Sequence, residues 1–327
     1  MTGKRVAAVF ATIILIVGAV LLRSVLDESK SIAAGPSPTE QPADSAVLTI
    51  VCSTEFNDAC QDLKASYGAK IEVISEPAGV TLDRLAKPKA QLPDMWFTLQ
   101  PFAAMLAAPG ASSVVVASAK PQLTLLADRA AALEGACGTT SLWRCLGNWA
   151  GDGWAEHGGQ TAWGSIKPGI ADPANEAIGL VQLANAVGGY FATTTFSRND
   201  WEADLDFTSW FRNIHSRSKL TTAKTPLATL VTQASALSIA ATDTAEVART
   251  SQAATNKYLT LTPSPTFVVN AELTSFGTSN ADLRADVRTS LATSLTSTYS
   301  WDKASTASLD DRAGTFIALR LKWKELK

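Results

Sequence analysis

The stretch LTIVCSTEFNDACQDL (residues 48–63) changes its character half-way along, at Ser53 and Thr54. The apolar, β-branched residues before this point predict a buried strand, and the apolar spacing after it predicts a helix. Ligands of open α/β sheets bind beyond the carboxyl ends of the strands, where helix N-termini present free N–H groups. The two hydroxyls can therefore donate to a ligand oxygen or simply cap the helix, and Glu55 beside them disfavours an anion.

The alternation of strand and helix continues along the chain. After the strand at residues 47–53 we expect strands at 70–77, 93–100 and 112–119, with helices at 56–68, 79–88 and 101–110 between them. This order predicts a parallel sheet with both faces covered. Residues 124–149 look helical. Further on, the pattern predicts strands at 164–171, 236–241 and 257–270, and helices at 172–192, 201–214, 227–233, from 244 onward and in parts of the tail from 281.

The length, charge and motifs of the chain exclude several classes of function. With 327 residues, the chain is long enough for one large domain or two lobes. Its net charge is −2 and no basic block occurs, which argues against a nucleic-acid partner. His157 and His215 lie far apart in the sequence and have no Cys or carboxylate cluster beside them, so no metal centre is expected. No phosphate-binding loop or nucleophile–base motif occurs, and the sequence predicts neither an enzyme nor a cofactor.

The N-terminal segment predicts the location of the protein. Residues 6–22 follow Lys4 and Arg5 and carry no charge, which is just long enough for a transmembrane helix. The two basic residues favour a cytoplasmic N-terminus, so we expect residues 1–30 to form a single-pass plasma-membrane anchor with the body on the extracytoplasmic side. The alternative is a cleaved signal peptide. Residues 31–46 are rich in Pro, Ser and Ala and predict a flexible linker.

Four cysteines fit an extracytoplasmic body. Cys52 and Cys60 are eight residues apart, and so are Cys137 and Cys145. Four cysteines allow three connectivities, of which local pairing is the simplest, and four buried free thiols are the alternative.

The order of these elements resembles the extracytoplasmic solute-binding proteins of the type II periplasmic kind. The molybdate- and sulfate-binding members have the nearest well-known pattern, and membrane-anchored actinobacterial forms are similar in their general sequence character. The resemblance rests on Ser53 and Thr54, on residues 93–96 (PDMW), on residues 169–173 (GIADP) with Gly179, and on the extended residues 258–269.

This resemblance implies an α/β, two-lobed type II periplasmic-binding-protein fold with two crossovers, preceded by one N-terminal transmembrane helix. Lobe 1 would comprise residues 47–113 plus 265–327, and lobe 2 residues 114–264. The crossovers would lie near residues 113–118 and 260–267. A ligand would lie in the cleft between the lobes.

The resemblance also implies ligand-binding residues besides Ser53 and Thr54. Asp172 and Asn175 would face the cleft from lobe 2, although Asp172 before Pro173 is also typical of a helix N-cap. Gln100 would occupy the matching place in lobe 1. Four tryptophans within a short span are either core residues or a surface for stacking on sugars: Trp143, Trp149, Trp154 and Trp163.

We therefore expect a membrane-tethered extracellular solute-binding protein, the substrate-binding component of an ABC-type importer. Its partners would be a small polar solute (an oxyanion, a sugar or a peptide-like molecule) and a membrane permease. The alternative is a structural or sensory protein of the cell envelope that keeps the fold and binds no ligand.

Overall fold

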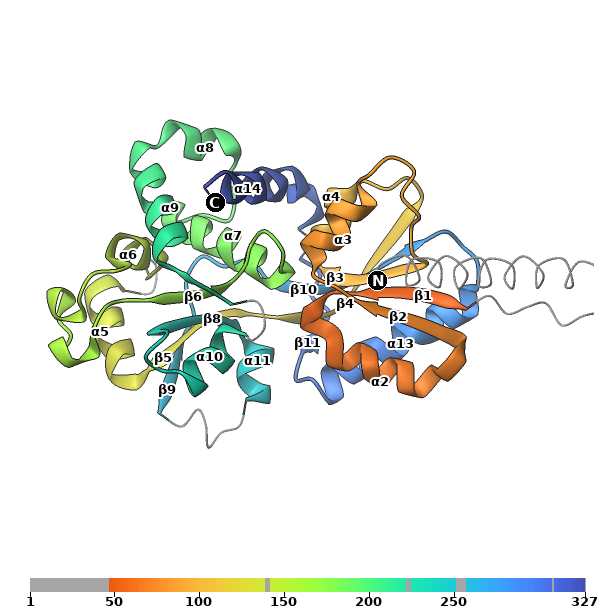
Figure 1. Cartoon of the computed structure of the whole chain (residues 1–327), viewed down its shortest axis with the longest axis horizontal. Helices are drawn as coiled ribbons and strands as arrows, with labels where there is room; N and C mark the ends of the chain where they lie inside the picture. Colours follow the sequence, from red (N-terminus) through yellow and green to blue (C-terminus); the bar gives the residue numbers. More distant parts are fainter. Residues whose placement is uncertain (1–46, 139–141, 222–224, 251–256, 308, 327) are drawn as a thin grey trace, which may run out of the picture. The chain divides into compact units, whose positions relative to one another are not determined.

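A six-stranded mixed sheet forms the first of two lobes (Figure 1). The computed structural model describes residues 47–138, 142–221, 225–250, 257–307 and 309–326. The strand order is β11-β4-β10-β3-β1-β2. The strands are β1 (Leu48–Cys52), β2 (Ile71–Ser75), β3 (Met95–Leu99), β4 (Ala111–Ala119), β10 (Val269–Phe276) and β11 (Asp302–Lys303).

The first sheet is parallel only in part. β1 runs parallel to β2 and β3, whereas β10 lies antiparallel between β3 and β4. A parallel sheet was expected. The sheet is mixed because β10, which returns to it late in the sequence, runs antiparallel to both of its neighbours. The helices of this lobe are α2 (Asn57–Tyr67), α3 (Ala78–Leu85), α4 (Phe102–Leu106) and α13 (Ala281–Ser297). α2 and α13 cover one face of the sheet, and α3 and α4 the other (Figure 1).

A five-stranded sheet forms the second lobe, in the order β7-β6-β8-β5-β9. Its strands are β5 (Pro121–Leu126), β6 (Pro168–Ala171), β7 (Lys219–Thr221), β8 (Ile239–Asp243) and β9 (Tyr258–Leu261). Its helices are α5 (Ala127–Cys137), α6 (Leu142–Trp149), α7 (Ala177–Phe191), α8 (Arg198–Ala203), α9 (Leu205–Arg217), α10 (Pro226–Thr232) and α11 (Thr244–Arg249).

The chain passes between the two sheets twice. The first passage is at Lys120, between the end of β4 and the start of β5. The expected boundary after Ser113 falls inside β4, because residues up to Ala119 pair with β10. The second passage is the connection between β9 and β10, residues 262–268, which contains the other expected boundary. The C-terminal helix α14 (Ala313–Glu325) then packs on both lobes.

Two expected elements differ from the structure. Residues 124–126 were expected to be helical but belong to β5, which pairs with β8 and β9. The long helix was expected to begin at Asp172 and Pro173 but begins at Ala177, with Glu176 as its N-cap. The Asp172 carboxylate instead accepts hydrogen bonds from Ala174 N (3.1 Å) and Asn175 Nδ2 (2.9 Å), so a turn precedes the helix.

Both local disulfides are confirmed. Cys52–Cys60 joins β1 to α2, and Cys137–Cys145 joins α5 to α6. The membrane anchor and the linker were expected in residues 1–46, which lie outside the described residues. Within the described part of the chain, no helix combines the length and the apolar character that crossing a bilayer requires.

Candidate functional site

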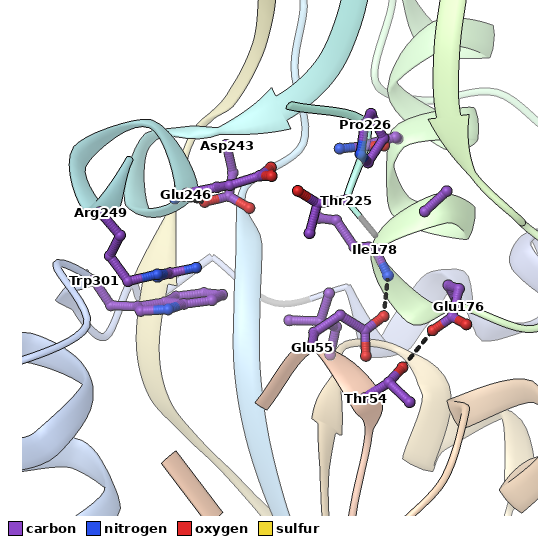
Figure 2. A pocket seen from close by; sticks show the side chains of 13 residues that line it. Thr54, Glu55, Glu176, Ile178, Thr225, Pro226, Asp243, Glu246, Arg249 and Trp301 are labelled. Atoms are coloured by element: carbon purple, nitrogen blue, oxygen red, sulfur yellow. Dashed lines mark hydrogen bonds between the residues drawn. The ribbon is translucent and has the colours of Figure 1, made fainter. Parts of the chain in front are cut away.

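A cavity of about 300 Å³ lies between the two lobes (Figure 2). This volume is at the lower end of the range for small-molecule pockets. Lobe 1 contributes Thr54, Glu55, Leu99 and Trp301. Lobe 2 contributes Ala171, Glu176, Ile178, Gln182, Thr225, Pro226, Asp243, Glu246 and Arg249.

Thr54 and Glu55 form one side of the cavity and connect the lobes. They begin η1 (Thr54–Phe56), the 3₁₀ turn that directly follows β1, so the strand end positions both side chains. Thr54 Oγ1 donates a hydrogen bond to Glu176 Oε2, and Glu55 Oε1 accepts one from Ile178 N at 2.8 Å. Glu55 was read from the sequence only as an obstacle to an anion, but it is bound to the first turn of α7, where backbone N–H groups lack helical partners.

Burial makes both carboxyl groups on this side hard to ionise. The pKa of Glu55 is raised to about 7, chiefly by burial and then by the charge of Glu176. The pKa of Glu176 is also raised by burial, while the hydrogen bond from Thr54 acts in the opposite direction.

Asp243 and Glu246 form a second pair of carboxyl groups on another side of the cavity (Figure 2). Asp243 ends β8 and caps α11, where its side chain accepts a hydrogen bond from Glu246 N at 2.9 Å. Glu246 Oε2 accepts one from Thr242 Oγ1 at 2.6 Å. Burial, and then the charge of Asp243, raise the pKa of Glu246 to about 7, and burial raises that of Asp243.

Arg249 and Trp301 lie at the edge of the cavity near this second pair (Figure 2). Arg249 is on α11 in lobe 2, and its Nη1 donates to the carbonyl oxygen of Tyr299 in lobe 1 at 2.6 Å. The cavity is therefore bordered by cross-lobe hydrogen bonds on two sides.

Three buried acceptor atoms of the cavity have no hydrogen-bond partner among the described residues. They are Glu55 Oε2, Gln182 Oε1 and Glu246 Oε1. Gln182 lies on α7 and is only 2% exposed, so water from the open surface does not reach its amide freely. Buried polar atoms are nearly always paired in folded proteins, and these three therefore need donors from a bound molecule or from water.

The structure brings one of the predicted site residues to the cavity, namely Thr54. The hydroxyl of Ser53 is buried in lobe 1 and donates to Thr98 Oγ1 at 2.9 Å. Gln100 Oε1 accepts from Asn270 Nδ2 (2.9 Å) and Leu309 N (3.3 Å). Neither of these two residues lines the cavity.

Asp172 and Asn175 lie in the turn before α7 and also do not line the cavity. Besides the bond between their side chains, the carbonyl oxygen of Asn175 accepts from Gly79 N of lobe 1 at 2.7 Å. This turn contacts lobe 1 beside the cavity. A ligand-binding role for all of the predicted residues, including Thr54, stays a prediction.

The four clustered tryptophans do not line the cavity either. Trp143 and Trp154 are buried in the core, and Trp154 packs edge-on against Trp163 with ring centroids 5.8 Å apart. Trp149 stacks on His157 at 4.1 Å. They are packing residues of lobe 2, and the aromatic residue at the cavity is Trp301.

Sequence reasoning missed the second carboxyl pair and Trp301. Asp243 and Glu246 have a local signal, since an acidic residue after a strand with a Glu three positions on is typical of a capped helix start. Trp301 has no local signal, because only the fold brings it next to residues 54 and 55. Among the described residues, no group of three or more His, Cys, Asp and Glu side chains could hold a metal ion.

Solved structures with a similar arrangement include periplasmic binding proteins. The chain is similar to the periplasmic binding protein AfuA of Actinobacillus pleuropneumoniae, solved with exogenous fructose-6-phosphate, with a TM-score of 0.57 and 13% identity over 85% of this chain and 98% of that one. It is also similar to the periplasmic binding protein P5PA, with a TM-score of 0.50 and 14% identity over 86% of this chain and 99% of that one. This chain has the two-lobed fold of a periplasmic binding protein. No protein-family model and no curated protein matches the sequence.

Proposed function

We propose that this protein binds a small polar solute in the cavity between its lobes. The observation that carries the proposal is the cavity itself, whose thirteen lining residues come from both lobes. A molecule bound there contacts both lobes at once, so its binding energy favours the arrangement in which the lobes meet.

The connections between the lobes suit this function. The chain crosses between the lobes at Lys120 and through residues 262–268. Rotations about a few backbone bonds in these two segments are enough to change the angle between the two sheets. The fold shared with periplasmic binding proteins supports the same conclusion.

The finer assignment follows from the sequence. We propose that the protein is the substrate-binding component of an ABC-type importer, tethered to the plasma membrane by residues 6–22, and that it delivers its solute to a permease. The two disulfides support a body outside the cytoplasm, because disulfides persist in oxidising compartments.

A structural or sensory envelope protein without a ligand is the second candidate. One observation favours it: Thr54 with Glu176, and Glu55 with Ile178, already join the lobes directly. In that case the lobes need no solute to hold them together.

Thermal unfolding separates the two candidates. The purified protein would be heated with oxyanions, sugars, amino acids, amines and short peptides, each in excess. A solute that binds only the folded protein stabilises it by about 2.7 kcal/mol at a hundredfold excess over Kd, and the melting temperature therefore rises with the logarithm of the solute concentration. Small-angle scattering would then show whether the same solute compacts the protein. An unchanged melting temperature with every solute would refute solute binding and favour the structural or sensory envelope protein.

A further inference from the structure

Carboxyl groups predominate among the ionisable groups around the cavity. Four carboxyl groups line it, from Glu55, Glu176, Asp243 and Glu246, and the described lining residues contain one cationic group, that of Arg249. Arg249 already donates to the carbonyl oxygen of Tyr299. An anionic solute would oppose the ionisation of these groups and would be repelled by any that are ionised, which argues against an oxyanion, one of the three kinds of solute considered from the sequence.

The unpaired atoms of the cavity are acceptors. Glu55 Oε2 and Glu246 Oε1 are buried and have no hydrogen bond of good geometry among the described residues, although the Thr225 hydroxyl is near enough to Glu246 to lower its pKa. The buried Gln182 Oε1 is a third such atom and lies on a different element, α7. A solute that satisfies all three with the carboxyl groups ionised must bring hydrogen-bond donors.

The remaining surface of the cavity is apolar. Leu99, Ile178, Pro226 and Trp301 also line it. Alkyl groups pack on such side chains, and the face of a tryptophan attracts a nearby cation. The described side chains lack a three-residue metal-binding group, so an organic cation fits this surface better than a metal ion.

We infer that the solute is an organic cation whose ammonium groups donate hydrogen bonds to the carboxyl groups of the cavity and whose alkyl part lies against Trp301 and its apolar neighbours. This inference rests on the proposed function and names the substrate class of the same site. The carboxyl groups lie in two pairs on different sides of the cavity, so a short diamine fits this distribution of charge (Figure 2).

The raised pKa values of Glu55 and Glu246 agree with this inference. Both carboxyl groups are hard to ionise in the empty cavity because burial removes water from them. An ammonium group beside them would favour their ionised forms, so binding would release protons to the solvent.

The test compares solutes that differ only in their end groups. Isothermal titration calorimetry on the full-length protein in a non-ionic detergent would use diaminobutane, butanediol and succinate, which share one carbon skeleton, together with diamines from diaminopropane to diaminohexane. Sugars, sugar phosphates and oxyanions would complete the panel. We expect a diamine to bind, with proton release detectable as a dependence of the heat on the buffer, and the diol and succinate not to bind.

Two matched variants locate the binding. Glu246→Gln keeps the shape and the acceptor oxygen but removes the charge, and it should weaken diamine binding roughly ten- to a hundredfold, the effect of a charged hydrogen bond. Glu134→Gln makes the same change at an exposed position on α5 and should leave binding unchanged. Circular dichroism would confirm that both variants fold.

Each outcome decides the inference. Binding of a sugar or an anion without any amine would overturn the cationic class and keep the proposed function. Absence of binding across the whole panel would overturn both. Diamine binding that is equally strong in Glu246→Gln would place the amine elsewhere and overturn the assigned site.

Discussion

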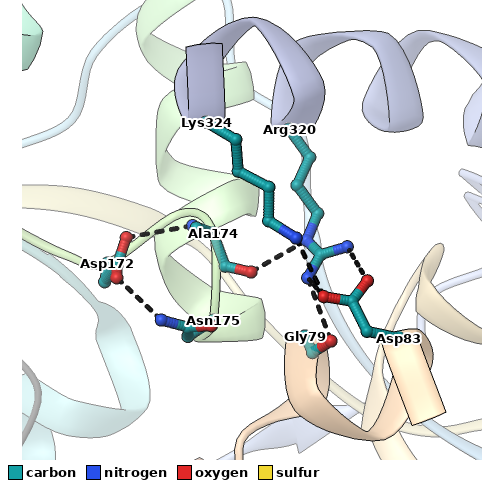
Figure 3. A network of polar contacts seen from close by, with 7 residues as sticks. All are labelled: Gly79, Asp83, Asp172, Ala174, Asn175, Arg320 and Lys324. Atoms are coloured by element: carbon teal, nitrogen blue, oxygen red, sulfur yellow. Dashed lines mark hydrogen bonds and ion pairs between the residues drawn. The ribbon is translucent and has the colours of Figure 1, made fainter. Parts of the chain in front are cut away.

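Replacing Arg320 by methionine tests how the C-terminal helix fastens the two lobes together (Figure 3). In lobe 1, its guanidinium contacts Asp83 through Nη1 (2.7 Å) and Nη2 (3.0 Å), and Nη2 also donates to Gly79 O at 2.9 Å. In lobe 2, its Nε donates to Ala174 O at 2.8 Å. One side chain thus joins α14 to α3 and to the turn before α7.

The expected cost follows from what each partner loses. Arg320 is 5% exposed, and its two backbone acceptors are buried, so each loses a donor that water does not readily replace. A buried polar group left without its partner costs about 1–3 kcal/mol. The side chain of Asp83 is 52% exposed and also contacts Lys324, so the ion pair itself adds less than about 1 kcal/mol. We expect Arg320→Met to lower the free energy of unfolding by roughly 3 kcal/mol.

Urea unfolding followed by tryptophan fluorescence measures this loss. Asp83→Asn is the matched variant, because it removes the charge of the partner and leaves both bonds from Arg320 to the carbonyl oxygens. It should cost about 1 kcal/mol or less. Equal costs for Arg320→Met and Asp83→Asn would refute the reasoning, since they would show that the cross-lobe bonds to the backbone contribute nothing measurable.

Three further predictions concern pH, the disulfide and the contact between the lobes. Burial raises the pKa of Glu55 from 4.5 to about 7, so the folded state binds more protons than the unfolded state between these pH values, and the melting temperature should fall as the pH rises from about 5 to about 8. Glu55→Gln should flatten this dependence, and a melting temperature that rises over the same range would contradict the prediction. Replacing Cys52 and Cys60 together by serine should lower the free energy of unfolding by about 2.5 kcal/mol, the chain-entropy value for so short a loop, and an unchanged urea midpoint would contradict that. Gly79→Ala places a methyl group 2.2 Å from Ala174 O, so scattering should show the lobes displaced and the urea midpoint lowered, and unaltered values of both would disprove the close approach.

Strands with a long apolar run were predictable from the sequence, and β5 was not. β1 and β3 are buried along almost their whole length, and their residues form near-continuous apolar runs. β5 has the sequence PQLTLL, in which polar residues alternate with leucines and a helical pattern follows directly. Its pairing with β8 and β9, more than a hundred residues further along the chain, determines its conformation. Such pairing leaves no trace in a local window.

The junction after β1 shows why the candidate site was predicted only in part. Ser53 and Thr54 are adjacent hydroxyls with the same local signal, but their side chains point in different directions. Ser53 donates to Thr98 within lobe 1, and Thr54 donates to Glu176 across the cleft. Which of two adjacent hydroxyls faces a ligand depends on the exact end of the strand, and strand ends are the least certain part of a sequence reading.

The start of α7 was misplaced for a related reason. Asp172 followed by Pro173 has the residue types of an N-cap and a first helical position. In the structure the acid instead stabilises a turn, and the carbonyl oxygens of Ala174 and Asn175 accept hydrogen bonds from Arg320 and Gly79 of lobe 1. These two carbonyl oxygens reach their donors only if the helix begins later, at Ala177. The donors lie far away in the sequence.

The two oxygens of Glu55 would connect the contact between the lobes to the proposed solute binding. One oxygen accepts from Ile178 N and so holds lobe 1 against α7, whereas the other is buried in the cavity without a partner among the described residues. A solute that donates to the second oxygen does not have to break the cross-lobe bond. It favours the ionised form of the carboxyl group, and an ionised acceptor makes the bond to Ile178 N stronger. If the proposed solute binds, solute binding and lobe contact reinforce each other through one side chain, which would supply the difference in affinity between two states that a closing binding protein requires.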